Sequence, residues 1–254
     1  MTRQNRQSFF DIYADEYDLL TNAAAREEYH AKEVAALIER FQPTSVLDAG
    51  CATGLTAGLF ARQGIPVVGL DRSKAMIEVA KQKFAASGLP ITFQVGQFEK
   101  LPVRLYNRFD LIVCLANSIS GVGTRTHLRE ALKRFHLALK PGGYLVLQLL
   151  NFAAVKEDEL LPIKATMNEG IIYERFIERQ RRHFFTYITR LDTTLSPPKL
   201  EVFRYSFDNF TEGEVTRCLH LRSFQRIEKY SDLYLTTPFR RRSRDIVFVC
   251  HKHD

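Results

Sequence analysis

The sequence predicts an α/β fold in which a doubly wound, mostly parallel seven-stranded sheet carries an antiparallel β insertion. Two observations predict this fold class. Before residue 151, short and nearly continuous apolar runs alternate five times with helical patterns, which is typical of parallel strands covered by helices on both faces. After residue 151, polar and apolar residues alternate with period two, which favours antiparallel strands with one exposed face. The length of 254 residues suits one large domain, or one domain with a modest insertion.

The individual elements follow from periodicity and helix caps. Apolar side chains at three- and four-residue steps predict a helix over residues 25–41, which Pro43 ends. Ser73 is a good amino-terminal cap for a helix that runs to residue 86, and Gly88 stands where a carboxyl-terminal cap belongs. Parallel strands are expected at residues 45–49, 66–70, 91–95, 111–115 and 144–150. The insertion is expected to hold strands at 171–176, 184–191 and 200–209, after which a helix at 211–221 and strands at 225–233 and 244–251 complete the main sheet.

The net charge of +7 raises the question of an anionic partner. Its densest basic segments, residues 175–182 and 240–244, are interrupted by Glu or Ser. A solvated face is therefore favoured over a nucleic-acid footprint, which stays open as the alternative. Residues 1–13 hold no apolar run long enough for a signal peptide or a membrane span. We expect a cytoplasmic protein with no membrane partner, either a monomer or a homodimer.

The four cysteines lie far apart and show no spacing that suits zinc or a redox disulfide. Most of them stand in apolar or small-residue segments, so we expect buried, unpaired thiols and no metal. His251 and His253 are expected to be solvated in a charged tail.

A turn of small residues follows the first predicted strand. Residues 46–54, VLDAGCATG, read as a strand ending in an acid, then a turn that opens a helix. Glycine tolerates positive φ and has no side chain in the way, so a ligand can lie against the backbone here. Dinucleotide sites show the spacing G-x-G-x-x-G, which this turn lacks. A nicotinamide-binding oxidoreductase is therefore disfavoured.

The turn resembles the first motif of the class I S-adenosylmethionine-dependent methyltransferases, acid-x-Gly-x-Gly-x-Gly. Asp48, Gly50 and Gly54 match this motif, and Ala52 replaces the middle glycine. The resemblance implies a Rossmann-like methyltransferase fold, with S-adenosyl-L-methionine as cofactor and S-adenosyl-L-homocysteine as product. Ala49 completes the cofactor-binding turn.

The resemblance continues along the next two strands. The family's ribose-binding acid corresponds to Asp71, followed by Arg72, although Asp71 could instead cap the next helix. Met76 stands where the family packs an apolar side chain on the adenine, and core packing explains it equally well. Gln97 and Phe98 stand in the adenine-contacting segment, with Gln97 in place of the usual Asp.

The fourth strand resembles the small-molecule branch of the family, which includes glycine, sarcosine and sugar N-methyltransferases. It does not resemble the Asn/Asp-Pro-Pro-aromatic motif of enzymes that methylate nucleobase amines. The resemblance implies that Leu115 flanks the cofactor and that Asn117 and Ser118 face the transferred methyl; the alternative is that the last two are turn residues. Asn151 matches an Asn of the glycine N-methyltransferase-like group.

Residues 10–18 resemble the family's leading segment, which folds over the cofactor as a lid. Tyr13, Tyr17 and Arg26 are its candidate cofactor residues, because the cofactor's carboxylate requires a cation and its sulfonium tolerates aromatic faces. A surface position is the alternative for Arg26, and Tyr17 is also a candidate neighbour of the methyl group. The expected parts are a lid (1–24), a cofactor-binding core (25–151), a substrate cap (152–210) and a final helix with two strands (211–254).

Methyl transfer from a sulfonium is an in-line displacement that depends mainly on alignment in a dry pocket. A hydroxyl acceptor needs a base, and His127, Tyr173 and His183 are available, but nothing in the spacing selects one. The predicted function is methyl transfer to a nitrogen or oxygen nucleophile of a small molecule. The alternatives are an RNA or protein methyltransferase and a non-catalytic S-adenosylmethionine-binding module.

Overall fold

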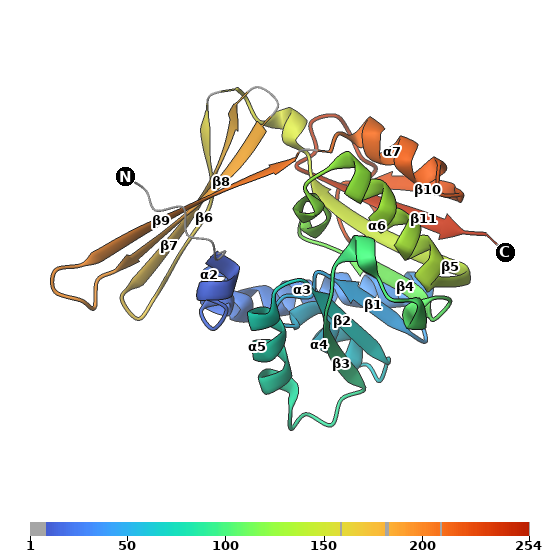
Figure 1. Ribbon diagram of the computed structural model, residues 1–254, viewed down its shortest axis with the longest axis horizontal. Coiled ribbons are helices and arrows are strands. Elements are labelled where there is room, and N and C mark those ends of the chain that lie inside the picture. Colours follow the sequence, from blue (N-terminus) through green and yellow to red (C-terminus); the bar gives the residue numbers. More distant parts are fainter. Residues whose placement is uncertain (1–8, 158, 181–182, 209, 254) are drawn as a thin grey trace.

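The structure is a computed structural model that describes residues 9–157, 159–180, 183–208 and 210–253. It contains two separate sheets, which lie on opposite sides of the molecule in Figure 1. The larger sheet has seven strands in the order β10-β11-β5-β4-β1-β2-β3, and the smaller has four in the order β6-β7-β8-β9. The predicted fold class is confirmed.

The seven-stranded sheet is parallel from β1 to β5, and β11 runs antiparallel to both of its neighbours, β5 and β10. A parallel strand flanked by parallel strands is buried on both faces, which explains the continuous apolar runs in the sequence. Its strands are β1 (Val46–Ala49), β2 (Val67–Asp71), β3 (Ile91–Val95), β4 (Phe109–Cys114), β5 (Leu139–Leu150), β10 (Phe224–Tyr230) and β11 (Asp245–Lys252).

Helices cover both faces of this sheet. Alternate residues of a strand point to opposite faces, so Val46 packs with the helices of one face and Leu47 with those of the other. The first face is covered by α3 (Ala23–Phe41), α4 (Leu55–Ala61) and α5 (Lys74–Phe84), and the second by α6 (Arg125–Ala138) and α7 (Glu212–His220). Short 3-10 turns lie at η1 (Phe98–Lys100), η2 (Val103–Leu105), η3 (Ser118–Val122) and η4 (Phe152–Ala154).

Helix caps agree with the sequence prediction at Ser73 and differ at Gly88. The Ser73 side chain accepts a hydrogen bond from the Met76 backbone at 3.2 Å and begins α5. The helix ends at Phe84, so the prediction of Gly88 as its cap is wrong; Gly88 has φ +65° and serves the following turn. The residues before Gly88 are small and exposed and bury little apolar surface, so the helical pattern overestimates the helix by part of a turn.

The four-stranded sheet is antiparallel throughout. Two of its strands, β7 and β8, were predicted with shorter bounds, and β9 was predicted one residue late, with its last predicted residue, 209, outside the described residues. The β6 strand was missed. The β6 strand lies at the sheet edge, is largely exposed and contains Pro162, so its apolar alternation is weak. The strands are β6 (Leu160–Asn168), β7 (Ile171–Gln180), β8 (His183–Asp192) and β9 (Lys199–Asp208).

The N-terminal segment joins the two sheets. Its two short helices are α1 (Phe9–Ile12) and α2 (Tyr17–Thr21). Phe9 and Leu20 are buried in one apolar cluster with residues of the four-stranded sheet. On the other side, Asp18 accepts a hydrogen bond from the Thr53 hydroxyl at 2.6 Å. The segment therefore lies across the turn that follows β1, as expected of a lid.

Arg190 ties this segment to the four-stranded sheet. Its side chain is buried and contacts both carboxylate oxygens of Glu16, at 2.9 and 3.0 Å. It also donates to Asp192 at 3.2 Å and lies over the ring of Tyr13, 4.9 Å from the centroid. A bidentate guanidinium–carboxylate contact is among the strongest polar contacts in proteins, so Arg190 determines how the segment docks.

Replacing Arg190 with methionine is expected to lower the free energy of unfolding by about 3 kcal/mol, because buried acids lose their cation. Limited proteolysis should also begin earlier within the N-terminal segment. Lys32→Met provides the control, since the Lys32–Glu28 pair is exposed and should contribute little to stability. Chemical denaturation of the two variants compares these losses; equal losses would contradict a structural role for the Arg190 contacts.

The cysteine prediction is confirmed, because Cys51, Cys114, Cys218 and Cys250 are all buried and free. The prediction of a solvated histidine tail is wrong for His251, which belongs to β11 and packs its ring on Tyr144 with centroids 4.7 Å apart. Among the described helices, none combines the length and apolarity needed to cross a membrane. The described residues also contain no cluster of metal-ligating side chains.

Candidate cofactor site

The strand order creates a switch point beside β1. The chain leaves β1 for β2 and β3 on one side and then continues with β4 and β5 on the other side. Ligands of open α/β sheets bind outside the carboxyl ends of the strands at such a point. The turn at Gly50 follows β1 and the segment at Ser118 follows β4, so both predicted motifs lie at this edge.

The turn after β1 has the backbone shape that its glycines allow. Gly50 and Gly54 have φ of +89° and +86°, values that L side chains rarely adopt. A Cβ atom at Gly50 would lie 2.6 Å from both Cβ and Oγ of Ser118. Ala52 also has positive φ, +47°, so it keeps the conformation of the glycine it replaces at a cost of about 1 kcal/mol.

Asp48 is a buried acid with an unused oxygen. Only 2% of the residue is exposed, and its Oδ2 atom has no hydrogen-bond partner among the described residues. Burial raises the pKa of Asp48 from its ordinary value of 3.8 to about 7; the backbone N–H of Ala57 opposes the rise and the nearby Asp71 adds to it. A buried carboxylate oxygen without a donor is costly, and a ligand that supplies a donor or a positive charge would stabilise it.

The raised pKa of Asp48 gives a pH-dependent prediction for Asp48→Asn. The folded protein holds this proton between about pH 4 and pH 7 while the unfolded chain has lost it, so this group's contribution to stability falls as the pH rises through that window. The neutral amide avoids the buried charge. We expect a higher melting temperature than wild type at pH 8, a gain that shrinks toward pH 5, and weaker cofactor binding measured by calorimetry.

Asp110→Asn is the matched control, because the pKa of Asp110 is shifted in the opposite direction from that of Asp48. Burial alone would raise the pKa of Asp110, but hydrogen bonds from Thr44, Ser45 and Lys140 outweigh it and lower the pKa. Its stabilising contribution is therefore complete above about pH 4. This variant should lose a constant amount of stability from pH 5 to pH 8. A pH-independent effect of Asp48→Asn would contradict the buried-charge argument.

Asp71 lies at the carboxyl end of β2 and holds the turn in place. Its Oδ2 accepts the Ala52 N–H at 3.0 Å and its Oδ1 accepts the Ser73 N–H at 2.9 Å. Each oxygen has a further lone pair for a ligand hydroxyl. Burial raises the pKa of Asp71, against the lowering effect of these backbone contacts. The alternative role of Asp71 as the cap of α5 is filled by Ser73, because the Ser73 side chain makes the capping contact.

The predicted adenine neighbours surround the same edge. Phe98 packs on Phe135 with ring centroids 5.5 Å apart, and its Cζ would lie 3.4 Å from a Cβ at Gly50. Met76 is buried, whereas Gln97 is exposed where η1 begins. Arg72 is exposed and donates to the Gly121 carbonyl at 3.0 Å, which links β2 to η3. Their contacts with the cofactor remain predictions.

The segment after β4 closes the site from the other side. Leu115 is buried, and Ser118 lies against Gly50. The Asn117 side-chain oxygen accepts the Leu150 N–H at 3.3 Å and the Ser120 hydroxyl at 2.8 Å. Asn151 donates its amide to backbone carbonyls of residues 241 and 243, at 2.9 and 2.7 Å. Both asparagines thus hold loops at the end of β5, and whether they also face the methyl group remains a prediction.

The lid residues separate into two groups. Tyr13 points to the four-stranded sheet, where its hydroxyl donates to Glu201 at 2.5 Å, and burial raises its pKa to about 12. Tyr17 is enclosed; burial raises its pKa, with opposing contributions from Arg26 and Arg175 and a further rise from Asp71. Tyr17 therefore lies within electrostatic range of Asp71 and Arg26, and the contacts of Tyr17 and Arg26 with the cofactor remain predictions, while the Tyr13 hydroxyl has another partner.

The described residues do not single out a general base among His127, Tyr173 and His183. His127 is exposed at the start of α6 and contacts the Val122 carbonyl at 3.0 Å. Tyr173 is buried in the four-stranded sheet and accepts from Arg190 at 3.2 Å. The side chain of His183 lies outside the described part of the structure.

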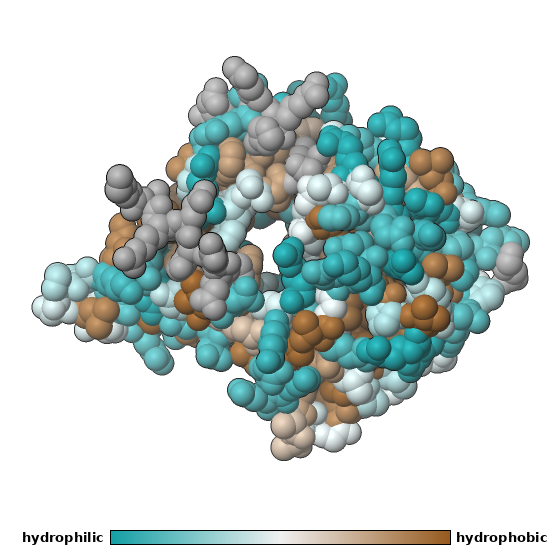
Figure 2. All heavy atoms as spheres, in the orientation of Figure 1, coloured by the Kyte–Doolittle hydropathy of each residue, from teal (hydrophilic) through white to brown (hydrophobic). Residues whose placement is uncertain are grey.

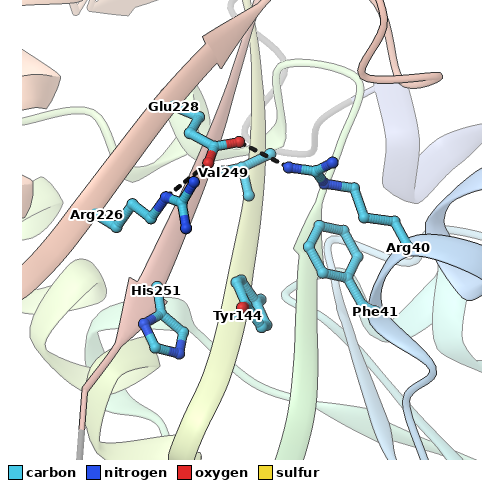
Figure 3. Close-up of a pocket in the computed structure, with 7 residues that line it drawn as sticks. All are labelled: Arg40, Phe41, Tyr144, Arg226, Glu228, Val249 and His251. Atoms are coloured by element: carbon cyan, nitrogen blue, oxygen red, sulfur yellow. Dashed lines mark hydrogen bonds and ion pairs between the residues drawn. The ribbon is translucent and has the colours of Figure 1, made fainter.

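A surface pocket lies at the opposite end of the sheet and is not this site (Figure 3). Tyr144 and His251 form one wall and Arg40 and Phe41 another, while Glu228 pairs with Arg40 at 2.8 Å. Its volume of about 140 Å³ falls well below the roughly 300–1,000 Å³ of small-molecule sites. The two arginines of this pocket, Arg40 and Arg226, both pair with Glu228, so neither is left without an acid to bind a ligand.

Known proteins agree with this geometry. A family model described as a methyltransferase domain matches residues 46–143. The glycine/sarcosine N-methyltransferase of Parasynechococcus marenigrum (strain WH8102) is 23% identical over 244 residues, which cover 91% of this chain and 80% of that protein. An S-adenosylmethionine-dependent methyltransferase from Clostridium acetobutylicum ATCC 824 has a TM-score of 0.78 at 17% identity, covering 96% of this chain and 99% of the other. An amino pentose methyltransferase from Micromonospora echinaspora, with S-adenosylmethionine bound, has a TM-score of 0.73 at 20% identity, covering 98% and 100%.

The fold, the switch-point site and these relatives define an enzyme that uses S-adenosylmethionine. The comparisons support a class I S-adenosylmethionine-dependent methyltransferase. Its residues fit that cofactor, because Asp48 has an orphaned buried oxygen and both Asp71 oxygens stand at the strand tip. Asp71 would hold the ribose, and Asp48 would lie close to the cofactor's positive charge.

Proposed function

We propose that this chain transfers a methyl group from S-adenosylmethionine to a nitrogen or oxygen nucleophile of a small molecule. The observation that carries the proposal is the enclosure of the switch point. The lid helix α1 packs on α5, α2 packs on β6, and β9 contacts η3. Figure 2 shows an opening near the middle of the molecule, between the half that holds the four-stranded sheet and the half that holds the seven-stranded sheet. A small acceptor suits a space bounded in this way better than a folded macromolecule does.

The relatives favour an amine acceptor. The curated relative is named for glycine and sarcosine, and the structural neighbour for an amino pentose. A neutral amine attacks with its own lone pair and needs no strong base. An amine acceptor agrees with the contacts of His127 and Tyr173, because His127 contacts the Val122 carbonyl and Tyr173 contacts Arg190. An oxygen acceptor would require a base supplied by the acceptor or by water.

The chain's own contribution to the reaction is alignment and exclusion of water. The bound cofactor supplies an electrophilic methyl group on a sulfonium. Positive charge disperses during the displacement, so a dry and pre-organised pocket is the main requirement. In this proposal, Tyr17, Asn117 and Ser118 line the methyl-proximal end, and the lid closes over it through the Asp18–Thr53 contact.

The test is transfer of a labelled methyl group from S-adenosylmethionine to a cell extract separated into small molecules, RNA and protein. We expect label in the small-molecule fraction, where mass spectrometry then identifies the acceptor and the methylated atom. Label confined to RNA or protein would overturn the proposal. Cofactor binding without label in any fraction would favour a non-catalytic binding module.

One observation favours a nucleic-acid substrate as the second candidate. Arg240, Arg241 and Arg242 are consecutive and exposed, and such residues can neutralise phosphates. The other basic segment does not extend this patch, because Arg175 is largely enclosed between the lid and the four-stranded sheet. The fractionated extract separates these candidates directly.

A further inference from the structure

A row of polar side chains runs along one face of α3. Arg26, His30 and Glu33 are four and three residues apart, so they share a face of the helix. His30 and Glu33 are buried, with only 8% and 7% of each residue exposed. Buried histidine and glutamate side chains need hydrogen-bond partners, and the neighbouring helix supplies one of them.

Both ring nitrogens of His30 have partners within the protein. Nδ1 lies 2.6 Å from Oε2 of Glu33, and Nε2 lies 2.9 Å from the hydroxyl oxygen of Thr56. A carboxylate only accepts hydrogen bonds, so the Nδ1–H donates to Glu33 and the neutral ring accepts the Thr56 hydroxyl at Nε2. Neither nitrogen is left for a substrate, which separates His30 from the candidate bases.

Thr56 lies in the first turn of α4, which begins directly after the cofactor turn. The next residue, Ala57, donates its backbone N–H to the buried acid Asp48. Gly54 precedes the helix and has no side chain that could cap it. The first turn of α4 is therefore fixed both by Asp48 of β1 and by His30 of α3.

The same hydrogen bond also bears on Arg26. α3 packs on α4, and apolar contacts between helices are not directional. The His30–Thr56 hydrogen bond is directional, so it fixes the rotation of α3 about its own axis. Arg26 lies about one turn before His30 on this face and is the predicted partner of the cofactor's carboxylate. Loss of the hydrogen bond would therefore disturb Asp48 and Arg26 together.

We propose that His30 is a positioning residue for S-adenosylmethionine, which acts through Thr56 on the first turn of α4 and through α3 on Arg26. Glu33 orients the imidazole by accepting its Nδ1–H. Glu33 has a further donor in Tyr29, since partial burial, the charge of Glu33 and a hydrogen bond to it raise the pKa of Tyr29 to about 12. The inference goes beyond the proposed function, because it concerns the cofactor and not the acceptor.

Two substitutions of His30 separate its two hydrogen bonds. Asparagine places its amide near the Nδ1 position and is too short to reach Thr56, whereas glutamine extends to the Nε2 position. We expect His30→Asn to weaken binding of S-adenosylhomocysteine by roughly tenfold, as one lost hydrogen bond would. His30→Gln should retain most of the affinity. Isothermal titration calorimetry measures both, and no acceptor is needed, so the result does not depend on the proposed function.

Thr56→Val tests the contact from the other helix. It removes the hydroxyl at nearly constant volume and should weaken S-adenosylhomocysteine binding by a similar factor, while Thr56→Ser should retain the affinity. Because the two side chains act through one contact, His30→Asn combined with Thr56→Val should lose no more affinity than either variant alone. Losses that multiply would show that the two side chains act separately and would overturn the proposal.

Leu37→Ala is the matched control for stability. Leu37 is fully buried in α3, about two turns after His30, so its truncation should lower the melting temperature and leave the His30–Thr56 contact in place. Its affinity for S-adenosylhomocysteine should be unchanged where the protein is folded. If Leu37→Ala weakens binding as much as His30→Asn does, or if His30→Asn and Thr56→Val melt lower and bind with wild-type affinity, His30 is a structural residue and the proposal is wrong.

Discussion

Asp71→Ala is expected to reduce the affinity for S-adenosylmethionine by roughly a hundredfold or more. The two Asp71 oxygens lie at the strand tip, each already fixed by one backbone N–H, so their free lone pairs are pre-oriented for the two ribose hydroxyls. Hydrogen bonds to a carboxylate contribute about 1.5–3 kcal/mol each. Isothermal titration with S-adenosylmethionine measures the loss, and circular dichroism checks that the fold persists.

Alanine also removes the acceptor of two backbone N–H groups, so we expect some loss of stability, about 1–3 kcal/mol. Asp110→Ala is the matched control. Asp110 is an acid at the opposite edge of the sheet that accepts from Thr44, Ser45 and Lys140. Its removal should cost comparable stability and leave the cofactor affinity unchanged. Unchanged affinity of Asp71→Ala would remove the ribose assignment.

The sequence predicts the seven-stranded sheet well because its signals are local. A buried parallel strand reads as a short apolar run, and β1 and β2 were each predicted to within one residue of the bounds that the structure has. The same logic fails for β6, because an edge strand buries little and carries no strong alternation. The helix before Gly88 ends early for a related reason: its last predicted turn has nothing to pack against.

The site was predicted where it depends on backbone shape and missed where it depends on tertiary contacts. The strand-turn-helix at Gly50 and the acid at Asp71 are short-range patterns. The partner of Tyr13, Glu201, is distant along the chain, and no local pattern specifies it.

The N-terminal segment, the turn after β1 and the four-stranded sheet form one connected structure. Asp18 joins the N-terminal segment to Thr53 of the turn, and it also pairs with Lys83 of α5 at 2.8 Å. Arg190 joins the same segment to the four-stranded sheet. The segment therefore contacts both sides of the predicted active site, so a change in how it docks should affect cofactor and acceptor binding together.

Gly50→Ala is expected to weaken cofactor binding by roughly a hundredfold and to lower the free energy of unfolding by about 2–4 kcal/mol. Two effects add. The backbone of Gly50 has φ +89°, and a Cβ there would lie 2.6 Å from Ser118. Relief of that overlap moves either the turn or Ser118, and both line the predicted cofactor site. Titration calorimetry and chemical denaturation measure the two losses separately.

Gly64→Ala isolates the conformational effect. Gly64 has φ +77°, no atom within 4 Å of an added Cβ, and a position after α4. It should lose about 1–2 kcal/mol of stability from backbone strain alone, with cofactor affinity unchanged. Combining Gly50→Ala with Ser118→Gly removes the atoms that the new methyl would meet and should recover part of the affinity. If Gly64→Ala weakened cofactor binding as much as Gly50→Ala does, a general loss of stability would explain both results, and the close approach of Ser118 to Gly50 would have no special role.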